Sequence, residues 1–163
     1  MGGDPHFSVI LKNGQLLCFS VQGEHNFTFN LISSKFIHIN ARFDQDSKRP
    51  EVTWIGSLGV VINTKKNTTK IRFESSTKTI HINNKATMSA GKIDSLVLEK
   101  GRMTISEASD VRKRDHSLPE VNVVVVEAGI SFSVKFMKSH IDMVWHKTGN
   151  KLTKSHGMIG NVA

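Results

Sequence analysis

The sequence predicts an all-β domain, most simply an antiparallel β-sandwich of about ten strands. Apolar and polar residues alternate with a period of two along almost the whole chain, as expected of strands with one buried and one exposed face. Turn signals rich in glycine and asparagine separate these runs and indicate hairpins, hence antiparallel pairing. The length of 163 residues suits one domain that buries a core without disulfide bonds. An open barrel is the alternative that this pattern allows.

The first alternating runs lie on either side of Asn13-Gly14, a dipeptide that favours a type I′ hairpin. The later runs have their apolar residues at Ile37 to Phe43, Ile71 and Phe73, Ile80 and Ile82, Met103 and Ile105, Val121 to Val126, Ile130 to Phe136, and Ile141 to Trp145. From this alternation we expect a core that includes Ile37, Ile39, Ile80, Ile82, Val123, Val125, Phe132, Val134 and Phe136.

Short turns and one long loop are expected between these strands. The turn signals are Asn83-Asn84, Ala90-Gly91, Lys100-Gly101 and Ala128-Gly129. The stretch Ser106–Glu120 is polar and charged, with Pro119 near its end, and is expected to be an exposed loop. A short helix over Ser106–Val111 is the alternative for its first part. Because the strands on both sides of this loop need each other's apolar faces, we expect residues 1–163 to form a single domain.

The chain is strongly basic, with a net charge of +8 and a sequence pI of about 9.8. Such a field attracts polyanions, which makes a sulfated glycan a candidate partner. Nucleic acid is not expected, because aromatic residues are not interleaved with the basic ones as a base-stacking platform requires. The alternative is that solvated basic loops only keep the domain in solution. The candidate glycan-binding residues are Lys48, Arg49, Lys65, Lys66, Arg112, Lys113 and Arg114, with Lys70 and Arg72 on a polar strand face.

Motifs of conventional enzymes and cofactor sites are not found in the sequence. There is no GxSxG, no HExxH, no glycine-rich phosphate loop and no paired-cysteine motif. A Ser/His/Asp triad is not excluded by spacing, but nothing indicates one. The repeated IHIN places His38 and His81 on polar strand faces, where we expect exposed histidines rather than metal ligands. No apolar stretch approaches the ~20 residues that span a bilayer, so no membrane partner is expected.

Two sequons indicate a secreted glycoprotein, with Asn26 and Asn67 as the acceptors. The segment Met1–Asp4 lacks the basic and apolar regions of a signal peptide, so we expect any secretion signal to lie upstream. Cys18 is the only cysteine, so no disulfide can form within the chain. It is either a buried, unreactive thiol or the partner of a cysteine outside this sequence.

Motifs at the two ends of the chain resemble those of a known family. Gly3-Asp4-Pro5-His6-Phe7 is followed by a strand containing the LCF sequence, and His156-Gly157-Met158-Ile159-Gly160-Asn161 lies near the end. These are similar to the first and late motifs of von Willebrand factor type D domains. The pattern GDPHF, LCF and HGxxGx, with no cysteine in the late motif, most resembles the C-terminal region of the inter-alpha-trypsin inhibitor heavy chains.

The resemblance implies a type D-like β domain in a secreted matrix protein whose partners are chondroitin sulfate, hyaluronan and the upstream heavy-chain domains. The heavy-chain region continues well beyond the late motif, so the resemblance also implies that this domain is truncated at its C-terminal end. General type D domains have cysteines in the late motif and an acidic calcium-binding loop after it. This chain has neither, so we expect no bound metal and doubt the usual disulfide framework.

In the heavy chains the Asp-Pro bond is where the C-terminal region is released and the new terminal Asp is esterified to chondroitin sulfate. The residues suit this chemistry, because the Asp4 carboxylate can attack its own peptide carbonyl to form a cyclic anhydride. His6 can protonate the departing nitrogen of Pro5, since the pKa of histidine is near neutral. The alternative is that Asp4-Pro5 only forms a turn ahead of a strand.

Overall fold

The structure, a computed structural model, describes residues 6–10, 16–20, 28–63, 67–84, 86–89, 95–98, 103–107, 119–126 and 129–147. Every helix or strand within these ranges is a β-strand, which confirms the all-β prediction. The strands are β1 (His6–Ile10), β2 (Leu16–Ser20), β3 (Thr28–Ser33), β4 (Ile37–Gln45), β5 (Thr53–Asn63), β6 (Thr68–Glu74), β7 (Thr79–Ile82), β8 (Ala86–Ser89), β9 (Ser95–Leu98), β10 (Met103–Glu107), β11 (Glu120–Val125), β12 (Ile130–Phe136) and β13 (Ile141–Lys147). They number 13, more than the expected ~10.

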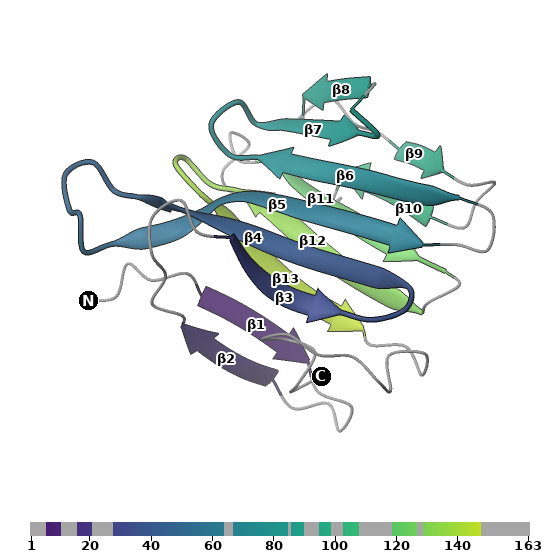
Figure 1. Cartoon of the computed structure of the whole chain (residues 1–163), viewed down its shortest axis with the longest axis horizontal. Coiled ribbons are helices and arrows are strands. Elements are labelled where there is room, and N and C mark those ends of the chain that lie inside the picture. Colours follow the sequence, from purple (N-terminus) through teal and green to yellow (C-terminus); the bar gives the residue numbers. More distant parts are fainter. Residues whose placement is uncertain are drawn as a thin grey trace.

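The strands form one continuous sheet that folds over into two layers, so the chain is β-sandwich-like (Figure 1). In the first layer the order is β3-β4-β5-β6-β7-β8, with every neighbouring pair antiparallel. In the second layer the order is β9-β10-β11-β12-β13-β1-β2. The β1–β13 pair is parallel, which departs from the expected antiparallel pairing because no hairpin connects the first strand to the last. The sheet is not closed into a barrel.

A bend in β5 joins the two layers. Arg42 pairs with Ser57 and Phe43 pairs with Ile55, so Gly56 is an extra residue that forms a bulge in β5. Beyond this bulge β5 pairs with β6, whereas before it Ile55 pairs with Ile141 of β13. A Cβ atom on Gly56 would lie 1.8 Å from a carboxylate oxygen of Asp44. A side chain at this position would therefore force the Asp44 carboxylate to move.

The core lies between the layers and is formed by the faces that the alternation predicted. Phe73 of β6 meets Phe136 of β12 across the interface, with ring centroids 6.3 Å apart. Phe132 stacks on Trp145 at 5.5 Å, and neither residue is exposed. All nine predicted core residues are buried, with exposed fractions of 6% or less, which confirms the assignment of strand faces: Ile37, Ile39, Ile80, Ile82, Val123, Val125, Phe132, Val134 and Phe136.

The turns and the long loop are borne out in part. Asn83 and Asn84 have φ angles of 52° and 57°, and Gly129 has a φ of 63°, as left-handed turn residues do. The predicted loop over Ser106–Glu120 is wrong at its edges, because Ser106 and Glu107 belong to β10 and Glu120 to β11. β10 extends two residues beyond Ile105, its last apolar residue, because the backbone of Glu107 still pairs with Val121. Residues 108–118, Asn13-Gly14 and Ala90-Gly91 lie outside the described residues.

Candidate functional site

The amino-terminal motif lies directly ahead of a strand that is paired on both edges. Asp4 and Pro5 are outside the described residues, and His6 is the first residue of β1. In β1, His6 pairs with Ser20 of β2, and the strand also pairs in parallel with β13 through Phe7 and Met143. The side chain of His6 is outside the described part of the structure. The backbone of β1 is thus held in the second layer from the residue that follows Pro5.

The other sequence motifs fall partly within the described residues. The late motif from His156 to Asn161 lies outside them, as does the sequon at Asn26. Asn67 is exposed just before β6, as a glycosylation acceptor must be. The backbone of Cys18 pairs with Ser8 in the β1–β2 hairpin, and its side chain is not among the described parts.

The candidate glycan-binding residues do not form one patch in the described part of the chain. Lys48 and Arg49 are exposed in the loop between β4 and β5, whereas Lys70 lies on β6 opposite Val61. Val61 is eight residues beyond Thr53, where β5 begins, so the separation along the strand is about 26 Å at 3.3 Å per residue. Lys65, Lys66, Arg112, Lys113 and Arg114 lie outside the described residues.

Asp46 organises the loop that carries Lys48 and Arg49. Its carboxylate accepts backbone hydrogen bonds from Lys48 at 2.7 Å and Arg49 at 3.0 Å. It also forms an ion pair with the Arg49 guanidinium at 3.7 Å. The backbone N–H of Lys48, above all, and then that of Arg49 hold the pKa of Asp46 below its usual value. Part of the basic charge of this loop is therefore neutralised within the loop.

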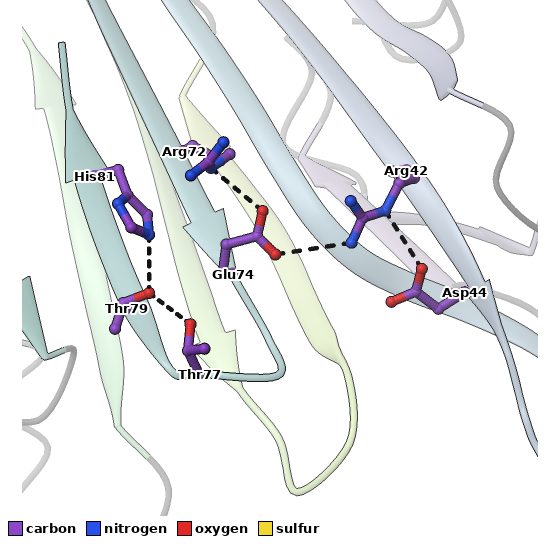
Figure 2. Close-up of polar contacts among 7 residues, drawn as sticks. All are labelled: Arg42, Asp44, Arg72, Glu74, Thr77, Thr79 and His81. Atoms are coloured by element: carbon purple, nitrogen blue, oxygen red, sulfur yellow. Dashed lines mark hydrogen bonds and ion pairs between the residues drawn. The ribbon is translucent and has the colours of Figure 1, made fainter. Parts of the chain in front are cut away.

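The outer face of the first layer carries an ion-pair network that sequence reasoning did not find. Glu74 of β6 lies between two arginines, 3.3 Å from Nε of Arg72 and 3.7 Å from a terminal nitrogen of Arg42. The Arg42–Glu74 contact crosses β5, and Arg42 also contacts Asp44 at 3.3 Å (Figure 2). The Arg42–Asp44 and Arg72–Glu74 pairs are two residues apart on one strand, whereas only the strand register brings Arg42 to Glu74. The alternation of the sequence shows which residues of β4 and β6 lie on the polar face. It does not show which of them are neighbours across strands.

A polar chain on β7 and the turn before it flanks this network. The hydroxyl oxygens of Thr77 and Thr79 are 2.6 Å apart, and Thr79 Oγ1 is 3.1 Å from Nε2 of His81 (Figure 2). His81 pairs with Arg72, and Thr79 pairs with Glu74. The side chains of β7 thus continue the same polar surface toward β8.

A row of residues crosses this face with glycine at its centre. The strand register from β7 to β3 places five residues side by side, in the order His81, Arg72, Gly59, Asn40 and Asn30. A Cβ atom built on Gly59 would meet no other atom within 4 Å. The layer of outward-facing side chains is therefore interrupted above Gly59.

The two IHIN histidines do not lie together. His38 is on β4 and His81 on β7, with β5 and β6 between them. Three strand spacings separate them by at least ~14 Å, which is too far for both to bind one metal ion. Among the described residues, no group of three or more His, Cys, Asp and Glu side chains is placed to hold a metal.

A serine and a histidine meet on the outer face of the second layer. Ser133 Oγ donates a hydrogen bond to Oδ1 of Asn122 at 2.7 Å and also contacts Nε2 of His146. Since the hydroxyl hydrogen is used by Asn122, the His146 ring donates to Ser133. Ser133 is only 2% exposed, so its oxygen is shielded from a substrate. These contacts tie β11, β12 and β13 together rather than activate a nucleophile.

No family model matches the chain, and a search of curated proteins finds no matching sequence. The described residues contain no helix long and apolar enough to cross a membrane. These comparisons assign no family to the chain.

Proposed function

We propose that this chain is a von Willebrand type D-like module of a secreted matrix protein of the inter-alpha-trypsin inhibitor heavy-chain kind. In this proposal the Asp4–Pro5 bond cleaves itself, and the new carboxyl end is linked to chondroitin sulfate or hyaluronan. One structural observation supports it beyond the sequence motifs: β1 begins at His6 and is paired with β2 and β13. In the sequence, the bond to be cut thus lies one residue ahead of the first residue of β1.

This position suits a cleavage that leaves the domain intact. A cut between Asp4 and Pro5 removes no residue of β1, so the strand pairs of the second layer remain. The backbone of His6 is held by its pairing with Ser20, two residues beyond Asp4. The main chain that carries the proposed general acid is thus part of the sheet.

The chemical step can be written with all atoms balanced. A carboxylate oxygen of Asp4 attacks the main-chain carbonyl carbon of Asp4, and the bond from this carbon to the nitrogen of Pro5 breaks. His6 supplies the proton that this nitrogen takes up. The product is a cyclic anhydride at Asp4 and a free amino terminus at Pro5. Water then opens the anhydride to a terminal Asp, or a sugar hydroxyl opens it to an ester.

Mass spectrometry of the full-length protein from a secretory host tests the proposal. The expected product begins at Pro5, and the variants Asp4→Asn and His6→Ala stay uncut because they lack the nucleophile and the proton donor. Asp46→Asn is the matched control, since it makes the same chemical change in an exposed loop and should leave cleavage unaltered. Normal cleavage of Asp4→Asn would assign the cut to an external protease, and an uncut wild-type chain at neutral and mildly acidic pH would refute self-processing.

A second candidate function is non-covalent binding of sulfated glycans by a module that is not processed. It is supported by the net charge of +8 and by exposed basic residues such as Lys48 and Lys70. Retention on chondroitin sulfate and heparin columns should be strong at ~50 mM salt and fall steeply toward physiological salt, because each contact releases counterions. No retention at ~50 mM salt would leave only a role of the charge in solubility.

A further inference from the structure

We propose that the outer face of the first layer has an anion-binding site centred on Gly59, which takes a carboxylate or sulfate group of an acidic polysaccharide. The inference rests on the proposed glycan binding and gives it a location. Of the residues involved, only Arg72 and Lys70 were among the basic residues that the sequence indicated as candidates for glycan binding. Below, "the Gly59 site" means Gly59 with its register partners Asn40 and Arg72.

The Gly59 site is a gap between two polar side chains. Asn40 of β4 and Arg72 of β6 are the direct register partners of Gly59 on its two sides. Their Cα atoms are two strand spacings apart, which is about 10 Å. Because a Cβ on Gly59 would find no atom within 4 Å, the space between the two side chains is open. A planar carboxylate or a sulfate group fits a space of this width.

Both sides of the gap present hydrogen-bond donors. Asn30 donates to Oδ1 of Asn40 at 2.9 Å, which leaves the amide N–H groups of Asn40 to face other partners. Arg72 uses Nε toward Glu74 at 3.3 Å. Within the described part of the chain, the terminal nitrogens of Arg72 have no acceptor, and its side chain is 51% exposed. A guanidinium group with free terminal N–H groups suits an oxyanion that accepts two hydrogen bonds.

Of the two rows beside the gap, one has balanced charges and the other carries the cation Lys70. On one side, the Arg42–Glu74 ion pair crosses β5 above Ser57, which is only 7% exposed (Figure 2). On the other side, Val61 lies between its partners His38 and Lys70. Glu74 and Asp44 together balance the charges of Arg42 and Arg72, so the excess positive charge of this face comes from Lys70.

Charge and shape favour an acidic polysaccharide as the ligand. The cations Arg42, Arg72 and Lys70 outnumber the carboxylates Asp44 and Glu74 on this face. The site holds one anionic group, and the polar strand face around it is extended enough for neighbouring sugars to lie on. The Gly59 site itself consists of Gly59, Asn40 and Arg72 and includes no Phe or Trp ring on which a base could stack, which favours a polysaccharide over single-stranded nucleic acid.

Filling the gap without changing any charge is the sharpest test. We compare the wild type with Gly59→Thr and Arg72→Gln, using calorimetric titration with a chondroitin sulfate hexasaccharide at low salt. Both variants should bind about tenfold more weakly, because the anion loses its place or its main donor. Lys135→Gln, on β12 in the other layer, is the matched control for the lost charge and should change affinity less than about twofold, since long-range charge effects are screened. An unsulfated hyaluronan hexasaccharide then distinguishes a carboxylate from a sulfate ligand.

The outcomes separate this inference from the function on which it rests. Wild-type affinity in Gly59→Thr, with unchanged thermal unfolding, would overturn the Gly59 site and leave glycan binding by dispersed charge. If Gly59→Thr does not fold, the comparison of Arg72→Gln with Lys135→Gln decides, because equal losses of affinity would overturn the site. No binding by the wild type would refute glycan binding as well. Tighter binding of a single-stranded oligonucleotide, blocked by Gly59→Thr, would contradict the polysaccharide assignment.

Discussion

Replacing Phe132 by alanine removes a fully buried ring from the hydrophobic core. Its exposed fraction is 0%, and it lies parallel to Trp145, with ring centroids 5.5 Å apart and an interplanar angle of 2°. A Phe→Ala change in a core costs about 3–5 kcal/mol, and loss of a stacked aromatic partner adds about 0.5–1.5 kcal/mol. We therefore expect the free energy of unfolding to fall by about 3.5–6.5 kcal/mol. The midpoint of thermal unfolding should fall by at least ~7 °C.

Urea unfolding followed by tryptophan fluorescence and far-UV circular dichroism measures this loss. Val124→Ala is the control, because Val124 is 37% exposed on β11 and should change stability by less than about 0.5 kcal/mol. Phe136→Ala should behave like Phe132→Ala, since Phe136 contacts Phe73 of the opposite layer. A loss below ~1 kcal/mol for Phe132 would place its ring on the surface and refute the assignment of strand faces.

Three further changes test the bend, the loop and the network. Gly56→Ala should destabilise the domain, because the new Cβ would meet the Asp44 carboxylate at 1.8 Å; unchanged stability in urea unfolding would contradict the role of the bulge. The pKa of Asp46 is lowered in the folded state by backbone hydrogen bonds, so its contribution to stability is complete above its unfolded pKa of about 3.9 and is lost as pH falls through the lower folded value. Asp46→Asn should therefore unfold with a weaker pH dependence in that range, and an identical acid transition would count against it. Glu74→Gln should cost less than about 1 kcal/mol, since its partner Arg42 is half-exposed, and a larger loss in thermal unfolding would mean that the network is structural.

The sequence predicted the buried face of the fold well because burial in a sheet has a period of two residues. One face of a strand must be apolar to pack against the other layer, so Ile37 and Ile39, or Val134 and Phe136, identify the core without knowledge of pairing. The turn at Asn83-Asn84 was equally readable, because a left-handed φ favours asparagine.

The strand β5 and the polar network were not predictable in the same way. β5 contains Gly56 and Gly59, which weaken a strand signal, and the run of buried residues from Ile55 to Leu58 interrupts its alternation. Yet this strand pairs with β4, β6 and β13 and joins the two layers. The contacts of Arg42 with Glu74 and of Gly59 with its neighbours depend on strand order and register, which the hydrophobic pattern of one strand does not specify.

The rate at which purified protein forms a new amino terminus at Pro5 tests the central claim most directly. Amino-terminal sequencing or mass spectrometry follows the new terminus over a wide range of protein concentration, with protease inhibitors present. Self-processing predicts a first-order rate that is independent of concentration and absent in Asp4→Asn, with hydroxylamine capturing the activated Asp4 carbonyl as a hydroxamate. A rate that falls on dilution or with protease inhibitors, or an Asp4→Asn variant that still exposes Pro5, would contradict it.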